Sequence, residues 1–459
     1  MFIRVHPWLI LLGTYVITPE RCREIFDRVL KFSDADQTEA LIAGGTHQLT
    51  RFANNTIHQN VAEEGCVLSV RTVYGGRTAR ATTNKFDDAS IRRVVEGSAS
   101  VARQQQPNPD LLPMPGPQEY PPVERFYPAT AELTPEARAH GVREAVEIAR
   151  RRGQTAAGIF SSGAGMQAIL NSTGLFAYHR ETRSEFSVTM LGGNSSGWAK
   201  ANSPDVRNIN VEELALRASA KAALSAEPIE LKPGRYTVIL EPAAVLDLVG
   251  FLFYDFGGLA IHDQRSFLTG RLGTQLFGEN ITITDDVYHP LQSGAPFDGE
   301  GMYRKTVPLV ERGVVRNVVY SRQTAKLMQA EPTGHGFPLP NEFGEAPMNI
   351  VIAGGGASVD KMIAGTERGI LVTRLWYIRE VDPYEKVLTG MTRDGTFLIE
   401  DGQARRGILN FRFNQSMIEM LSKVEMLGPA ERAAGEEAFE MVLPAMKVRD
   451  FNFTEVTKF

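Results

Sequence analysis

The sequence predicts an α+β protein of two domains, with mostly antiparallel sheets flanked by helices. Three observations support this class: the length of 459 residues, a repeated change between helical and alternating periodicity, and short turns between successive alternating segments. A chain of this length exceeds what a single hydrophobic core usually holds. Runs of hairpin-like strands separated by capped helices are typical of α+β folds.

The first predicted helix begins at Thr18-Pro19, because threonine caps a helix and proline suits its first position. From residue 39 the pattern alternates, and Gly75-Gly76 predicts a hairpin turn. Asp87 or Asp88 is expected to cap the next helix. The segment 107–128 holds eight prolines in 22 residues and therefore predicts an extended strap, because proline removes backbone donors.

Further helices are predicted after Thr134-Pro135 and after Asn210, with a strand meander between them. Turns in that meander are predicted at Ser162-Gly163 and at Asn171 to Gly174. The best domain boundary is near residue 232. We therefore expect an N-terminal extension (1–17), an N-terminal domain (18–232) and a C-terminal domain (233–459).

The C-terminal domain is predicted to begin with a strand at 236–240 and a helix from Pro242 to about Tyr254. Later segments again resemble hairpins, with predicted turns at Asp394-Gly395 and Asp401-Gly402.

Composition indicates an ordinary globular protein of the cytoplasm. The chain is 43% hydrophobic and 22% charged, and its formal net charge is −5. The negative charge argues against a nucleic-acid partner, which requires a basic face. The two cysteines, Cys22 and Cys66, cannot form a disulfide framework. The apolar run 8–17 is too short to span a membrane and precedes no small-residue cleavage site, so we expect no membrane partner.

Zinc hydrolases typically carry two histidines one helical turn apart. The sequence lacks such a pair, because no two of its eight histidines lie within five residues of each other. A weaker candidate site for zinc, manganese or iron combines imidazole and carboxylate groups. Its residues are His262, Asp263, Asp285, Asp286 and His289. The alternative is that His262-Asp263 is a polar loop pair and that Asp285-Asp286 forms a turn.

An alternating segment near residue 376 offers a candidate peptide-binding surface. Trp376 and Tyr377 follow Arg374 in "LVTRLWYIREVDPY". Their aromatic side chains either pack within the sheet or contact a ligand from its exposed face. As an edge strand, this segment could accept an extended peptide by strand addition.

Several stretches, taken in order, resemble the TldD/PmbA family of metalloproteases. They are LTRFANNTIHQNVAEEGCVLSVRTVYGGRTARATTN, SFLTGRLGTQLFGENITITDD, LVTRLWYIREVDPYEKVLTGMTRDGTFLIEDGQ and ILNFRFNQSMIEMLSKVEMLG. Together they extend over roughly residues 20–450. The resemblance implies an assembly in which TldD-type subunits hold zinc with an H-E-x-x-x-H helix and a later cysteine. TldE-type subunits pair with them, and unstructured peptides are cleaved in an enclosed cavity.

The resemblance also implies that this chain lacks the zinc motif. Counting back from "SFLTGRLG", the helix expected to read H-E-x-x-x-H reads "VGFLFY", with Val249, Gly250 and Tyr254 at the ligand and glutamate positions. A tyrosine is a poor zinc ligand because its phenol ionises near pH 10. No cysteine follows Cys66. We therefore expect a TldE-like, non-catalytic subunit that binds no cofactor itself, with zinc in a TldD-type partner.

Two other hypotheses stay open at the level of sequence. One is a self-sufficient metallopeptidase whose metal has moved to the His262 to His289 candidates. The other is a peptide-binding scaffold that forms a homodimer. Whether the chain is itself an enzyme depends on which of the three holds.

Overall fold

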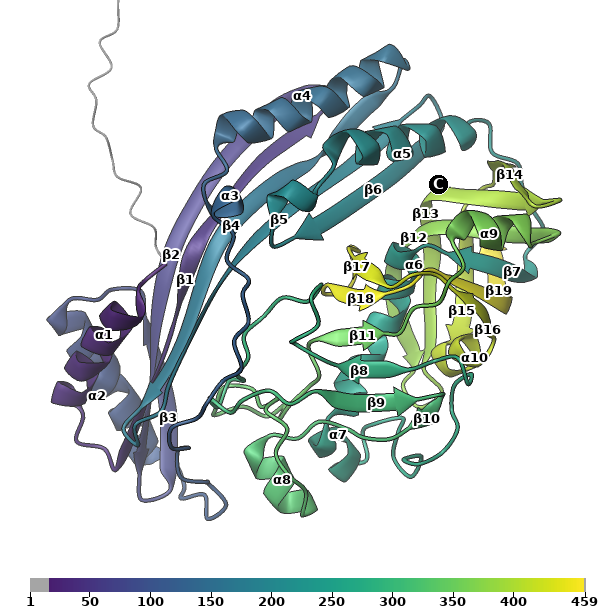
Figure 1. The fold of residues 1–459 in the computed structure, drawn as a ribbon. Coiled ribbons are helices and arrows are strands. Elements are labelled where there is room, and N and C mark those ends of the chain that lie inside the picture. The colour runs from purple at the N-terminus through teal and green to yellow at the C-terminus, as the bar shows by residue number, and fades with distance from the viewer. Residues whose placement is uncertain (1–15, 458–459) are drawn as a thin grey trace, which may run out of the picture.

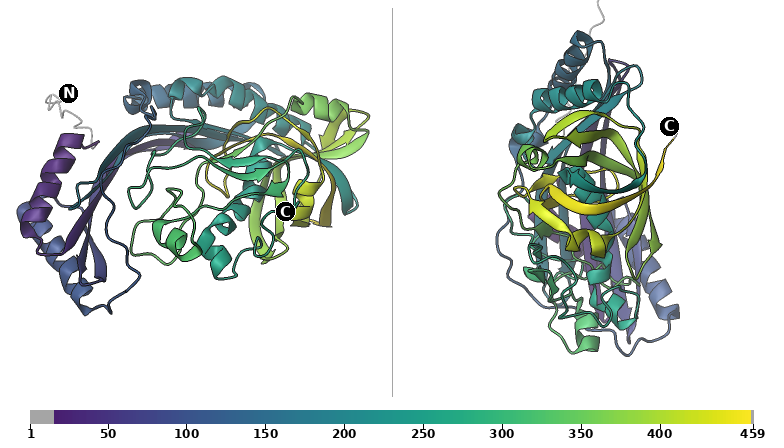
Figure 2. Two further views of the ribbon diagram at one scale, coloured as in Figure 1. Left: turned by 60° about the horizontal axis from the view of Figure 1, so that its bottom comes forward. Right: turned by 90° about the vertical axis from the view of Figure 1, so that its right-hand side faces the viewer.

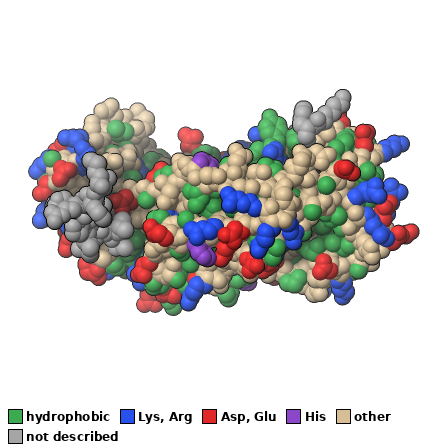
Figure 3. All heavy atoms as spheres, turned by 90° about the horizontal axis from the view of Figure 1, so that it is seen from above, with side chains coloured by type: hydrophobic (Ala, Val, Ile, Leu, Met, Phe, Trp, Pro, Cys, Tyr) green, Lys and Arg blue, Asp and Glu red, His purple; other side chains and the backbone are tan. Residues whose placement is uncertain are grey.

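The computed structural model describes residues 16–457, so residues 1–15 of the predicted N-terminal extension lie outside the described residues. Within that range the fold is α+β, as predicted, and all but two of the ladders between named strands are antiparallel. None of the helices in this range is long and apolar enough to cross a membrane. On the face seen in Figure 3, basic and acidic side chains are interspersed along the molecule. The exclusion of nucleic acid stays a prediction.

The N-terminal half is one curved sheet that arches over the C-terminal half (Figures 1 and 2). Its strands are β1 (Gln37–Ala53), β2 (Thr56–Tyr74), β3 (Arg77–Thr83), β4 (Thr155–Asn171), β5 (Phe176–Leu191) and β6 (Ser196–Ser203). Their spatial order is β3-β2-β1-β4-β5-β6, and every neighbouring pair is antiparallel. The sheet therefore presents one convex face and one concave face, and the concave face is turned toward the rest of the chain.

Helices cover the convex face at both ends of this sheet (Figure 1). They are α1 (Pro19–Phe32), α2 (Asp88–Gln104), the short α3 (Pro128–Ala131), α4 (Pro135–Arg151), the 3-10 helix η1 (Val206–Asn208) and α5 (Val211–Leu224). The predicted caps are confirmed, because Thr18, Asp87, Thr134 and Asn210 each accept a hydrogen bond from the first turn of a helix. The proline-rich segment runs from α2 to α3 without helix or named strand.

The predicted turns of the N-terminal half are only partly correct. Gly75 and Gly76 have φ angles of 52° and 76° and join β2 to β3, as predicted. The turn at residues 171–174 joins β4 to β5. The turn predicted at Ser162-Gly163 is wrong, because both residues lie inside the unbroken ladder between β4 and β5. Their small side chains serve a different purpose, described below.

The C-terminal half contains a five-stranded barrel and a second sheet. The barrel strands are β7 (Gly234–Leu240), β12 (Arg368–Asp382), β13 (Val387–Glu400), β15 (Phe411–Ser416) and β19 (Met446–Val456), with β14 (Gln403–Gly407) and β16 (Val424–Leu427) attached. They close in a ring, because β12 pairs with both β7 and β13. The second sheet has the order β10-β9-β8-β11-β18-β17. Its strands are β8 (Ile283–Asp285), β9 (Val307–Glu311), β10 (Val314–Val315), β11 (Ile350–Ile352), β17 (Glu431–Ala433) and β18 (Met441–Leu443).

Short helices lie between these two sheets, below them and beside the barrel (Figure 1). They are α6 (Pro242–Val249), the 3-10 helix η2 (Gly250–Phe256), α7 (Gly258–His262), α8 (Arg322–Met328), α9 (Val359–Ala364) and α10 (Met417–Ser422). Residues 243–249 of α6 are all buried, and they join the core that also contains side chains of the barrel and of the second sheet. The helix that should carry the metal motif is thus central to the domain.

One expectation for the barrel needs correction. Asp394-Gly395 is not a hairpin turn: β13 runs through it, and the register against β12 shifts there, as in a β-bulge. From Arg374 onward β12 pairs only with β13, so the segment around Trp376 is an edge strand, as expected; the pairing of β12 with β7 is confined to 370–372. The turn at Asp401-Gly402, between β13 and β14, is as predicted.

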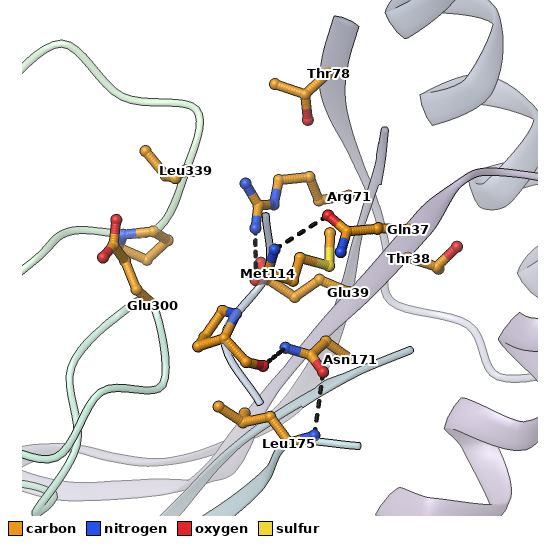
Figure 4. Close-up of polar contacts among 12 residues, drawn as sticks. Gln37, Thr38, Glu39, Arg71, Thr78, Met114, Asn171, Leu175, Glu300 and Leu339 are labelled. Atoms are coloured by element: carbon orange, nitrogen blue, oxygen red, sulfur yellow. Dashed lines mark hydrogen bonds and ion pairs between the residues drawn. The ribbon is translucent and has the colours of Figure 1, made fainter. Parts of the chain in front are cut away.

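The two halves are joined at both ends of the concave face. At one end Glu39 accepts a hydrogen bond from Arg71 at 2.8 Å (Figure 4). Glu39 also accepts from Arg80 at 2.5 Å, and Arg80 Nε donates to the carbonyl oxygen of Leu339. At the other end Ser196 donates to Asp394 at 2.7 Å. The concave face between these contacts is left partly open.

Candidate functional site

The helix expected to hold zinc does not bring its three motif positions together. Val249 ends α6 and is 0% exposed, whereas Tyr254 in η2 is 63% exposed. Gly250 begins the tighter 3-10 turn and is buried. A zinc site needs three ligands converging on one point, and here none of these three side chains is a good donor.

A neighbouring segment occupies the space in which a side chain of residue 250 would lie. We call residues 434–440 the closing segment. A Cβ atom added to Gly250 would stand 2.5 Å from the Cβ atom of Ala438 in this segment. A glutamate at position 250, as in the family motif, would therefore require the closing segment to move. The residues present do not fit a zinc ion at this position.

Asp247 holds the closing segment against α6. Its Oδ1 atom accepts hydrogen bonds from the backbone N–H groups of Glu436 (3.2 Å) and Glu437 (3.1 Å). Burial raises the pKa of Asp247 to about 6, although these backbone donors oppose the rise. From the other side, Lys200 in β6 donates to the carbonyl oxygen of Gly435 at 2.9 Å. The closing segment thus connects the central helix to the N-terminal sheet.

The first pair of candidate metal ligands is a local, exposed contact. His262 Nδ1 lies 2.9 Å from Asp263 Oδ1, and Arg265 contacts the other carboxylate oxygen of Asp263 at 3.0 Å. The pKa of Asp263 is lowered, first by the hydrogen bond from His262 and then by Arg265. The two residues follow one another at the end of α7. This is the polar loop pair that was the alternative to a metal site.

The second group of candidates is divided among separate contacts. Asp285 is fully buried and accepts hydrogen bonds from His335 Nε2 at 2.9 Å and from the backbone N–H of Asn349 at 2.8 Å. Burial alone would raise the pKa of Asp285, but His335, Arg304 and the backbone N–H of Asn349 together outweigh it and the pKa is lowered. Asp286 accepts from Thr306 at 3.1 Å, and His289 Nδ1 accepts from the backbone of Leu291.

The five candidates therefore do not meet around one point. In residues 16–457, no group of three or more His, Cys, Asp or Glu side chains is arranged to hold a metal ion. Sequence reasoning also missed His335, which pairs with Asp285 across 50 residues. No local spacing signals such a contact, because the two residues meet only through the tertiary fold.

Arg374, Trp376 and Tyr377 have separate roles in the structure. Arg374 is 7% exposed and binds Asp394 through Nε (3.0 Å) and Nη2 (2.5 Å), with its guanidinium 5.0 Å from the ring centroid of Trp198. Trp376 and Tyr377 are 37% and 54% exposed. The backbone N–H of Tyr377 already donates to Glu437 in the closing segment at 3.0 Å. This donor is therefore not free for an added strand.

A cavity of about 800 Å³ lies on the other side of the closing segment, against the concave face of the N-terminal sheet. The floor is made by the middle of β1, β2, β4 and β5, and β17 and the end of the closing segment contribute Arg432 and Glu440. Its size is within the range of ligand pockets. The small residues of "IFSSGAG" lie in this floor, where sequence reasoning had placed a turn.

The architecture is thus a curved sheet that arches over a barrel with a central helix. Three family models match the chain in order: PmbA/TldA metallopeptidase domain 1 at residues 38–102, the central domain at 130–226 and the C-terminal domain at 233–455. The chain therefore belongs to the PmbA/TldA metallopeptidase family.

Individual relatives agree with this assignment. The chain is 23% identical over 404 residues to a protein named metalloprotease PmbA from Escherichia coli O157:H7, covering 83% of this chain and 85% of that one. It is 26% identical over 275 residues to an uncharacterised protein of Methanocaldococcus jannaschii, covering 58% and 63%.

Solved structures share the fold over nearly the whole chain. TldE from Thermococcus kodakarensis superposes with a TM-score of 0.86 at 20% identity, covering 95% of this chain and 100% of that one. A protein of Thermotoga maritima described as a putative modulator of a DNA gyrase gives 0.84 at 19% identity, with 94% and 100% covered. These likenesses confirm the α+β architecture.

Proposed function

We propose that this chain is a TldE-like, non-catalytic subunit that pairs with a zinc-bearing TldD-type subunit to cleave unstructured peptides. The observation that carries the proposal is the packing at Gly250. Gly250 stands where the family motif would place the general base, and Ala438 occupies the space that a side chain there would need. Neither Val249 nor Tyr254 supplies a good metal ligand. Without ligands and base, no hydroxide can be generated at this position.

The closing segment supports the same proposal. It is anchored by Asp247 on one side and by Lys200 on the other, so it belongs to the folded core of the contact between the halves. Cleavage then falls to a partner, while this chain contributes its concave sheet to the enclosure around the peptide. The cytoplasm, where such peptides are turned over, is the compartment we expect.

The test is to mix the purified chain with a relative from the same organism that carries H-E-x-x-x-H. We expect the two to co-elute on a sizing column and a fluorogenic, unstructured peptide to be hydrolysed only in the mixture. Replacing the glutamate of the partner's motif by glutamine should abolish hydrolysis and leave the complex intact. A chain that does not associate with any such relative contradicts the proposal.

The relocated-metal hypothesis is tested in the same mixture. The variant His262→Ala/His289→Ala removes both imidazoles of the candidate cluster. We expect its activity with the partner to equal that of the unmodified chain, because His262 is exposed and His289 binds only its local backbone. Loss of activity in a folded, partner-bound double variant would favour the relocated site.

A further inference from the structure

Three glycines stand side by side on the concave face. Gly45 in β1 is paired with Gly65 in β2 on one side and with Gly165 in β4 on the other. Directly paired residues of antiparallel strands point to the same face, so this row of the sheet has no side chains and leaves a trench. At Gly45 the backbone of β4 is close, with the carbonyl oxygen of Ala164 2.2 Å from where a Cβ atom would stand, so the open space lies over Gly65 and Gly165. A Cβ atom added to Gly65 would meet nothing within 4 Å. The space above this end of the trench is therefore open.

The trench continues toward charged side chains. Gly165 is paired with Glu181 in β5, so a carboxylate stands in the same row as the glycines. The row lies in the floor of the cavity of about 800 Å³ described above. The cavity is thus a long depression with a backbone floor at one end and ionised groups at the other.

Carboxylates outnumber cations in this lining, and the cations are already engaged. Arg183 binds Glu181 at 2.5 Å. Arg432 donates to Asn202, to the carbonyl oxygen of Leu291 and to Ser293. In the part of the chain that the structure describes, the side chains of two glutamates in this lining have no hydrogen bond or ion pair: Glu63 and Glu440. Glu64 follows Glu63 in β2, so its side chain points to the opposite, convex face. A cationic ligand group would find partners here, whereas an anionic group would meet repulsion.

Two buried polar side chains in the lining each have a nitrogen atom without a hydrogen-bond partner. His179 is 5% exposed, and its Nε2 atom lies 3.8 Å from Glu181, beyond hydrogen-bond length. Asn202 is 8% exposed, and its Nδ2 donor has no partner. Since Arg432 can only donate, the amide oxygen of Asn202 faces it and the NH₂ group requires an acceptor from elsewhere. Buried polar groups normally find such partners.

From these contacts we infer that the trench binds a linear peptide segment that carries lysine or arginine side chains. Ammonium or guanidinium groups suit the unpaired glutamates, and a peptide carbonyl suits the NH₂ group of Asn202. A simple polyamine offers the cations but no acceptor. The absence of side chains at Gly65 and Gly165 gives such a segment room to lie against the sheet. The inference rests on the proposed function, because it names the chemistry of the peptide that the concave sheet would enclose, but binding to this chain can be measured without the zinc-bearing partner.

Binding can be measured on the full chain by fluorescence anisotropy. The probe is a fluorescein-labelled peptide of alternating lysine and glycine, and the comparison peptide has glutamate in place of each lysine. We expect the lysine peptide to bind at least tenfold more tightly. Spermidine should compete poorly, because it has no carbonyl group. Equal binding of the two peptides, or competition by spermidine as effective as by unlabelled lysine peptide, would overturn the inference.

Two variants locate the binding site, each with a matched control. Gly65→Leu fills the open end of the trench and should weaken binding of the lysine peptide at least tenfold, whereas Gly193→Leu, at an exposed glycine with equally open space, should not. Glu63→Gln should weaken binding and keep the fold, since Glu63 is exposed. The control Glu212→Gln makes the same charge change at an exposed position on α5. Unchanged affinity in both trench variants would contradict the assignment.

Discussion

At the scale of single residues, Gly250 is the position that most directly separates this chain from a zinc-bearing relative. A methyl group at residue 250 has no space as long as the methyl group of Ala438 is present. The conflict involves one pair of carbon atoms, so it can be created and relieved by single substitutions.

We predict that Gly250→Ala lowers the free energy of unfolding by about 1–3 kcal/mol, because an extra methyl group in a packed core forces its neighbours to shift. Gly250→Ala/Ala438→Gly should recover most of that loss, since it removes the opposing Cβ atom. Chemical denaturation measures both. If the double variant is no more stable than Gly250→Ala, the closing segment does not pack on Gly250 as described.

Asp247, which holds the closing segment, makes the free energy of unfolding depend on pH. Burial raises its pKa from 3.8 to about 6, so the folded protein binds the proton more tightly than the unfolded chain does. Its contribution to stability is therefore fully present below pH 4 and is lost as the pH rises through 6. Between pH 5 and 7.5 we expect a loss on the order of 1 kcal/mol.

The measurement compares the unmodified chain with Asp247→Asn over this pH range. Asparagine does not titrate, so the stability of the unmodified chain relative to the variant should fall as the pH rises over this range. Hydrogen exchange at the amides of Glu436 and Glu437, which donate to Asp247, should report the same site. A pH-independent difference would show that Asp247 does not titrate in this range.

Residue-level signals in the sequence were reliable where the cause is local. Thr18, Asp87, Thr134 and Asn210 cap helices because a side-chain oxygen reaches a donor three residues away. The pair Asp285–His335 and the contact of Asp247 with the closing segment could not be predicted, because their partners are 50 to 190 residues distant.

At the scale of elements, the predicted turns were wrong where the same local residues are compatible with both a turn and a continuous strand. Asp394-Gly395 has the residues of a hairpin turn, with φ angles of 51° and 135°, but it forms a bulge inside β13. Ser162-Gly163 has small residues typical of a turn, but it continues β4 across the sheet. In both places the long-range ladder, which the sequence does not display, decides the outcome.

The ion pairs at one end of β1 make a testable contribution at this scale. Glu39 is 1% exposed and binds both Arg71 and Arg80. We predict that Glu39→Gln destabilises the fold by about 3–5 kcal/mol, because it leaves buried positive charge without its partner. Glu24→Gln, which removes an exposed pair with Arg21, should have little effect. Equal unfolding midpoints for the two variants would contradict this role.

At the scale of the whole molecule, the closing segment lies between two sites of opposite character. On one side is the central helix α6, where the metal motif is absent and the space is filled. On the other side is the open trench on the concave sheet. The first was predicted from the resemblance to the TldD/PmbA family, which implies where the motif would stand. Nothing in the sequence indicated the second, because the glycine row comes from three strands that meet only in the fold.

The central claim is that the metal of the assembly belongs to the partner and not to this chain. Inductively coupled plasma mass spectrometry on the chain alone and on the purified complex, each equilibrated with zinc and then dialysed, tests it most directly. The account predicts far less than one zinc per chain when it is alone, and about one zinc per pair in the complex. A full equivalent of zinc in the isolated chain, lost on His262→Ala/His289→Ala substitution, would contradict it.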